Sequence, residues 1–312
     1  MNLLQREKNA RIVISVRCAV RHGADYAGKW ASAISIVGWA RVSRTGNIWS
    51  GRSKRRLCIP TISNRKLRRR MSDLLKSGAL NRMSEELNHI PPRKLINPLF
   101  SLLYNGDPQI KWAAVEALGQ AVSKLADQDI EAARVMMRRL MWNLNDESGG
   151  IGWGSPEAMG EILAGHEGLA KEYAHILMSY MKEEGNYLEL ESLQRGLLWG
   201  IGRACRKRPD LFREAAPLII PYLRSQDATV RALAAWVLGV MGFEPALEHL
   251  EQLTTDDTEI EIYLESQLVK YRVKDIAENA RKSIGSKSKK QVQGIRHRPP
   301  RSKEYRSKRH LH

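Results

Sequence analysis

A glycine-rich segment in the middle of the chain carries the residues whose types and spacing could do chemistry. Glycines let backbone N–H groups approach a ligand closely, and a helix start near Pro156 would favour an anion. No Gly-Lys-Ser or Gly-Lys-Thr follows, so this is not a P-loop. The alternative is a structural loop that caps one helix and admits Trp153 to the core. The candidate interaction residues are Asn143, Asn145, Asp146, Glu147, Gly149, Gly150, Gly152, Trp153 and Glu157.

Metal binding and catalysis find little support in the same region. Glu157 and Glu161 lie four residues apart, so on a helix they would share a face and could hold an ion. Glutamates at this spacing are more often a solvated face, and no metal-ligand motif of known spacing is present. There is no Gly-x-Ser-x-Gly nucleophile motif, and Cys205 fits a small buried residue. We therefore predict no catalytic residue, no metal and no cofactor, although enzyme activity stays open.

Basic residues of the central part gather in a few places along two expected helices. Cations at a helix end complement its dipole, which accounts for the run at 206–208 without any ligand. The alternative is contact with a polyanion. The candidate contacts are Arg138, Arg139, Arg203, Arg206, Lys207 and Arg208.

These residues sit on elements that recur along the chain. A helix that ends in an apolar residue and glycine appears four times, closing at Gly119, Gly160, Gly202 and Gly239, with spacings of 41, 42 and 37 residues. Self-similarity at such a period is typical of stacked helical repeats. The pattern predicts an all-α fold, an α-solenoid of about five helix pairs with no sheet. The expected helices span 93–104 and 107–124, 129–145 and 155–165, 168–183 and 189–206, 209–224 and 227–241, and 245–254 and 258–282.

Charge divides the chain into three parts. Residues 1–70 hold 17 Lys and Arg against 2 Asp and Glu, residues 71–280 hold 22 against 31, and residues 281–312 hold 12 against 1. We expect a repeat body at 65–282 and a basic disordered tail at 283–312. For residues 1–64 three interpretations stay open: a disordered basic arm, a start site placed upstream of a true one at 67–71, or a targeting peptide.

Two of the repeats resemble the HEAT repeat. Residues 221–239 read Pro221-Tyr-Leu-Arg-Ser-Gln-Asp227-Ala-Thr-Val-Arg231 and end in Leu238-Gly239, and residues 98–119 follow the same pattern with Lys111 in place of arginine. The likeness covers about 92–282 and is nearest to the HEAT-like units named after phycobilin lyases. Residues 138–163 are also similar to an uncharacterised bacterial HEAT-repeat family. The resemblance implies a solenoid whose concave face binds proteins.

The leading functional hypothesis is therefore a non-enzymatic HEAT-repeat scaffold with a protein partner. The first alternative is a nucleic-acid-associated protein that binds unspecifically through its basic ends. The second alternative is a lyase-like accessory enzyme that uses the 143–157 loop. No run of eighteen apolar residues is present, so we expect no membrane partner. Three scattered cysteines argue against a disulfide framework and favour a cytoplasmic location.

Overall fold

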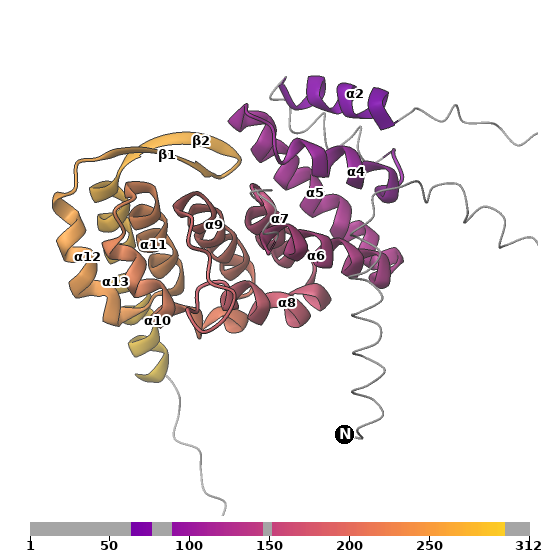
Figure 1. Ribbon diagram of the computed structural model, residues 1–312. Helices are drawn as coiled ribbons and strands as arrows, with labels where there is room; N and C mark the ends of the chain where they lie inside the picture. Colours follow the sequence, from indigo (N-terminus) through magenta and orange to yellow (C-terminus); the bar gives the residue numbers. More distant parts are fainter. Residues whose placement is uncertain (1–63, 77–88, 146–151, 297–312) are drawn as a thin grey trace, which may run out of the picture. The chain divides into compact units, whose positions relative to one another are not determined.

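The computed structural model describes residues 64–76, 89–145 and 152–296, which belong to a unit that begins at Pro60. Helix α2 (Asn64–Lys76) packs on α4 and α5 (Figure 1). The second short helix expected after residue 78 lies outside the described residues, as does the whole segment 1–63.

Consecutive helix pairs follow, and they confirm the predicted α-solenoid. Most boundaries agree with the expected ones to within a few residues. The pairs are α4 (Pro92–Leu102) with α5 (Pro108–Gln128), α6 (Ile130–Leu144) with α7 (Ser155–Gly165), and α8 (Glu167–Ser179) with α9 (Glu191–Lys207). Next, η1 (Pro209–Phe212), α10 (Ala215–Ile219) and η2 (Ile220–Arg224) together pair with α11 (Ala228–Met241), and η3 (Glu244–Ala246), α12 (Leu247–Gln252) and η4 (Leu253–Thr255) pair with α13 (Val273–Arg296).

The second helix of each pair packs on the second helices of its neighbours, in the order α5, α7, α9, α11, α13. Small residues permit this approach: a Cβ added to Gly160 would lie 2.2 Å from the Cα of Gly200, so α7 and α9 touch backbone to backbone. The apolar seam predicted through Leu118, Met159, Ile201 and Leu238 is confirmed, since all four are fully buried.

The predicted helix caps are also present. The carboxylate of Asp107 accepts a hydrogen bond from the backbone N–H of Gln109 at 2.9 Å, and that of Asp227 accepts one from Val230 at 2.9 Å. These bonds satisfy N–H groups that have no partner inside the helix. Pro108 stands in the first turn of α5, where its missing N–H costs nothing.

The expectation of a body without a sheet is wrong at one place. Where a helix was expected from residue 258, the chain forms an antiparallel hairpin of β1 (Glu259–Leu264) and β2 (Gln267–Arg272), and α13 begins only at Val273. The turn residues Glu265 and Ser266 both have positive φ, of 51° and 63°. This is the conformation of a two-residue turn whose twist suits a hairpin.

Helix α13 also continues past the boundary expected at 282. It extends through Arg296, and Ile284 is fully buried. The first part of the predicted disordered tail is therefore helical, because Ile284 continues the apolar face of Ile276, Ala277 and Ala280. Residues 297–312 lie outside the described residues.

Candidate functional site

The hairpin crosses the surface formed by the second helices, which we call the second-helix surface (α5, α7, α9 and α11) (Figure 1). Tyr263 of β1 lies flat on Trp112 of α5, with ring centroids 4.6 Å apart and planes 3° apart. Trp199 of α9 contacts the same tryptophan at 4.6 Å, tilted by 53°, and its Nε1 donates to the carbonyl of Tyr263 at 2.5 Å. Burial raises the pKa of Tyr263, which therefore stays neutral.

Polar contacts hold the hairpin at its turn. The hydroxyl of Ser266 donates to a carboxylate oxygen of Glu116 on α5 at 2.7 Å. A guanidinium nitrogen of Arg206 on α9 lies 3.6 Å from the carboxylate of Glu265. The turn is thereby tied to two different helices.

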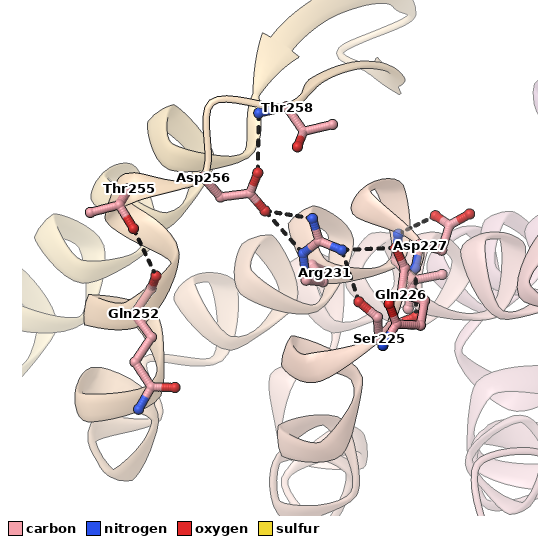
Figure 2. A network of polar contacts seen from close by, with 9 residues as sticks. Ser225, Gln226, Asp227, Arg231, Gln252, Thr255, Asp256 and Thr258 are labelled. Atoms are coloured by element: carbon pink, nitrogen blue, oxygen red, sulfur yellow. Dashed lines mark hydrogen bonds and ion pairs between the residues drawn. The ribbon is translucent and has the colours of Figure 1, made fainter.

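A network around Arg231 holds the base of the hairpin (Figure 2). Its Nε and a terminal nitrogen donate to one oxygen of Asp256, at 3.0 and 2.6 Å, while the other terminal nitrogen donates to the carbonyls of Ser225 and Gln226 at 2.8 and 3.0 Å. The second oxygen of Asp256 accepts from the N–H of Thr258 at 3.1 Å. Partial burial opposes ionisation of Asp256, but the bonds from Thr258 and Arg231 outweigh it and lower the pKa.

Ion pairs also join successive second helices. Arg203 of α9 binds the buried Glu161 of α7 through two bonds of 2.6 and 2.9 Å. Between α9 and α11, Arg195 donates to both carboxylate oxygens of Asp227 at 3.1 Å. Burial raises the pKa of Glu161, and its bonds to Arg203 only partly offset this. Burial also acts on Asp227, but there the bonds from Arg195 and Val230 prevail and lower the pKa.

The pair that joins α5 to α7 has one unsatisfied atom. Lys111 donates to Oε1 of Glu157 at 2.7 Å, and the Glu157 side chain is only 3% exposed. Its Oε2 is buried and has no hydrogen-bond partner within the described part of the chain. Gly196 of α9 leaves room for this carboxylate, since an added Cβ would lie 2.5 Å from Oε2.

A pocket of about 230 Å³ opens between β1 and the first turns of these helices. Trp153, at the entry to α7, is 47% exposed beside it. The volume is below the roughly 300–1,000 Å³ typical of small-molecule sites. The pocket, called the Trp153 pocket below, is lined by Lys111, Trp112, Trp153, Glu157, Ser192, Arg195, Gly196, Trp199, Thr229, Leu233, Glu261, Ile262 and Tyr263.

One wall of this pocket belongs to a segment that matches a known family. The family model described as "HEAT-like repeat" matches residues 191–239, which run from α9 to α11. The chain contains a HEAT-like repeat. Arg195, Trp199 and Asp227 all belong to this repeat, so the repeat itself supplies one side of the pocket and one of the ion pairs.

Similarity to individual proteins covers more of the chain than this repeat does. An uncharacterized protein of Archaeoglobus fulgidus is 28% identical over 199 residues, which cover 61% of this chain and 95% of that protein. Among solved structures, the archaeal HEAT-like repeats protein from Thermococcus onnurineus NA1 is 16% identical, with a TM-score of 0.36 and coverage of 77% and 92%. A designed armadillo repeat protein in complex with the peptide (KR)4 is 15% identical, with a TM-score of 0.40 and coverage of 69% and 98%.

The structure separates the members of the predicted interaction loop. Trp153 and Glu157 line the pocket, whereas Asn143 donates from its amide to the hydroxyl of Tyr104, and Asn145 ends α6. Gly152 lies against the Asn143 carbonyl, 2.7 Å from an added Cβ. Asp146, Glu147, Gly149 and Gly150 lie outside the described residues.

The structure differs from the expectations for this loop in two details, whereas binding of a partner by the loop stays a prediction. Trp153 is about half exposed and is not part of the core. Ser155 and Glu157 are buried, so the first turn of α7 faces its neighbours and an acidic side chain, which disfavours an anion there. Glu157 and Glu161 are bonded to different cations, Lys111 and Arg203.

The predicted polyanion contacts are only partly brought together. Arg203, Arg206 and Lys207 line a cavity of about 380 Å³ beside the hairpin turn, although Arg203 is bonded to Glu161. Arg208 donates to the carbonyl of Leu163 at 3.0 Å. On α6, Arg138 is exposed, while Arg139 lies 3.9 Å from the centre of the Phe100 ring and donates to Asn97 at 2.8 Å.

The sequence reasoning missed Tyr263, Trp112 and Arg195. Tyr263 lies on a strand that was expected to be a helix, and its contacts come from distant parts of the chain. The alternation Glu259-Ile260-Glu261-Ile262 was the available signal for that strand.

No helix in the described ranges is long and apolar enough to cross a bilayer.

Proposed function

We propose that the chain is a binding scaffold that holds a protein partner on the second-helix surface, at the Trp153 pocket. The observation that carries this proposal is the half-exposed Trp153 beside three largely buried aromatic rings, Trp112, Trp199 and Tyr263. Exposed tryptophan and arginine next to a desolvated centre are typical of the residues that dominate protein interfaces.

Two further features favour a protein partner. The pocket is too small for most cofactors, yet its volume suits one or two side chains. The side chain of Arg195 is 47% exposed at the pocket, and exposed arginine is one of the residue types enriched at protein interfaces.

The surface is also held in place before any partner arrives. The hairpin is fixed at its base by Arg231 and Asp256 and near its turn by Trp199 and Glu116. A preorganised surface loses little conformational entropy on binding, which favours affinity. This is the property that a scaffold requires.

The test is affinity capture of the tagged full chain from the cells that produce it, comparing Trp153→Ala with Trp142→Ala. Trp142 is 73% exposed on α6 and serves as the matched control. We expect W153A to lose the specific partners, at about 2 kcal/mol or roughly thirtyfold in Kd, while W142A keeps them. A photo-crosslinker at Ser192, which also lines the pocket, should label the same proteins. If W153A captures the same proteins as the original chain, the pocket is not the binding site of the partner.

A further inference from the structure

The geometry of the hairpin turn determines which backbone groups of β1 point away from β2. Leu264 and Gln267 flank the two-residue turn and are directly paired. In such a hairpin the flanking pair exchanges both hydrogen bonds, and bonded and non-bonded pairs then alternate along the ladder. The N–H and C=O groups of Leu264, Ile262 and Ile260 therefore face β2, whereas those of Tyr263, Glu261 and Glu259 point outward.

One contact of the hairpin agrees with this assignment. The carbonyl of Tyr263 accepts the bond from Nε1 of Trp199, which lies on the outer side of β1. Two residues further back, the backbone N–H and C=O of Glu261 have no hydrogen bond to any described residue outside the sheet, and the sheet has two strands. Glu261 therefore presents an open strand edge.

This open edge borders the Trp153 pocket. The hairpin residues that line the pocket are Glu261, Ile262 and Tyr263, all from β1. Across the pocket stand the first turns of α9 and α11, with Arg195 and Leu233. An extended segment placed beside β1 would lie along the pocket with its backbone against Glu261.

We propose that the partner binds by adding an extended strand, antiparallel, to the outer edge of β1. This rests on the proposed function, because it uses the same pocket, and it specifies the form that the partner takes. Strand addition gives affinity through main-chain hydrogen bonds and specificity through pockets for alternate side chains. Antiparallel pairing is the more stable geometry per residue.

The side chains of β1 define the sequence that fits. Ile260 and Ile262 are buried on one face of β1, while Glu259 and Glu261 are exposed on the other, which is also the face of the buried Tyr263. A residue paired with Glu261 places its side chain on the same face as that carboxylate, and its neighbours place theirs on the face of Ile260 and Ile262. The partner segment therefore alternates basic and apolar residues, since a basic residue paired with each glutamate is favourable across strands.

The first experiment uses the full chain and a fluorescent seven-residue peptide of alternating lysine and valine. Its control has the same composition in blocks, with the three valines together. We expect the alternating peptide to bind at least tenfold more tightly, because only alternation places lysines and valines on opposite faces. Equal binding of the two peptides would reduce the effect to charge attraction and overturn strand addition.

Backbone methylation of the peptide tests the hydrogen bonds without altering the protein. In antiparallel register, the lysine paired with Glu261 directs its N–H toward β1, whereas the valine N–H groups point away. N-methylation of the lysines should weaken binding at least tenfold, and N-methylation of the valines should weaken it less than threefold. The same loss from both peptides would refute the assigned pairing.

A charge-reversal variant places the peptide at β1. Glu261→Lys should abolish binding of the lysine–valine peptide and create binding of a glutamate–valine peptide, while Glu248→Lys, an equal charge change on exposed α12, should do neither. If Glu261→Lys neither weakens binding of the lysine–valine peptide nor creates binding of the glutamate–valine peptide, the proposal is overturned. If strand addition fails while W153A still loses the captured partners, the scaffold function stands and its partner binds in another conformation.

Discussion

Tyr263 stacks on Trp112 with their ring planes only 3° apart, although Trp112 lies in the first helix pair and Tyr263 in the hairpin that separates the two helices of the last pair. The contact joins the hairpin to α5 across the intervening helices α7, α9 and α11. It makes β1 part of the wall of the Trp153 pocket. Stability and binding at this surface are therefore coupled through one aromatic ring.

Tyr263→Ala should release the hairpin from the second-helix surface. Removing a buried aromatic side chain costs about 3–5 kcal/mol, and Tyr263 is 5% exposed. Urea unfolding followed by tryptophan fluorescence measures this loss. Tyr263→Phe keeps the ring and should lose no more than about 1 kcal/mol. A variant Tyr263→Ala as stable as the original chain would mean that the hairpin contributes nothing to the fold.

Most of the helical stack could be predicted from the sequence because its signals are local. Gly160 and Gly239 mark close helix contacts, and Asp107 and Asp227 cap helices within three residues of their own positions. Each signal needs only the neighbouring residues to be read. The helix boundaries before residue 245 agreed with the structure for this reason.

The hairpin and the pocket could not be predicted in the same way. Ile260, Tyr263 and Leu264 also fit the spacing of one helix face, so the short alternating run was ambiguous. The turn is made by Glu265 and Ser266, whereas hairpin turns of this type usually carry Asn-Gly or Asp-Gly. The pocket depends on contacts between distant segments, which no local pattern specifies.

Leu238→Ala tests the seam between the second helices. Leu238 is fully buried in α11, and loss of a buried leucine side chain costs about 2–5 kcal/mol. Leu247, which is 37% exposed on α12, provides the control, and its alanine variant should change stability by less than about 1 kcal/mol. Chemical denaturation of the two variants gives the comparison. Similar losses would show that burial in the seam does not determine stability.

Arg203→Met tests the ion pair with buried Glu161. A carboxyl whose pKa is higher in the folded than in the unfolded chain destabilises the fold as pH rises through that range. Burial already raises the pKa of Glu161, and loss of Arg203 raises it further. We expect R203M to be less stable at pH 7, by up to about 3 kcal/mol, and the deficit to shrink toward pH 5.

Urea unfolding between pH 5 and pH 8 measures this dependence. The double variant Glu161→Gln with Arg203→Met has no carboxyl to titrate at this place. Its stability relative to the original chain should therefore vary much less with pH than that of R203M. A deficit of R203M that is the same at every pH would indicate that removing Arg203 does not change the pKa of Glu161.

We predict that the basic ends bind nucleic acid weakly and without sequence preference, and that this binding does not involve the Trp153 pocket. Residues 1–70 and 281–312 hold 17 and 12 Lys and Arg, whereas residues 71–280 hold 22 against 31 acids. Contacts between basic side chains and phosphates release counterions, so affinity should fall steeply with salt. The comparison uses a truncated chain, 64–296, which keeps helix α2 and the buried Ile284 of α13. A cut at residue 283 would remove Ile284.

Fluorescence anisotropy with a DNA duplex at 50 and 200 mM salt compares the full chain with the 64–296 chain. We expect the full chain to lose at least a hundredfold in affinity between the two salts, as several phosphate contacts require. The truncated chain should bind far more weakly at both, because its 33 Lys and Arg are nearly balanced by 31 Asp and Glu and it lacks the basic surplus of residues 1–63 and 297–312. Tight binding by the truncated chain would point to Arg206 and Lys207 beside the hairpin turn, and Lys207→Glu should then abolish it.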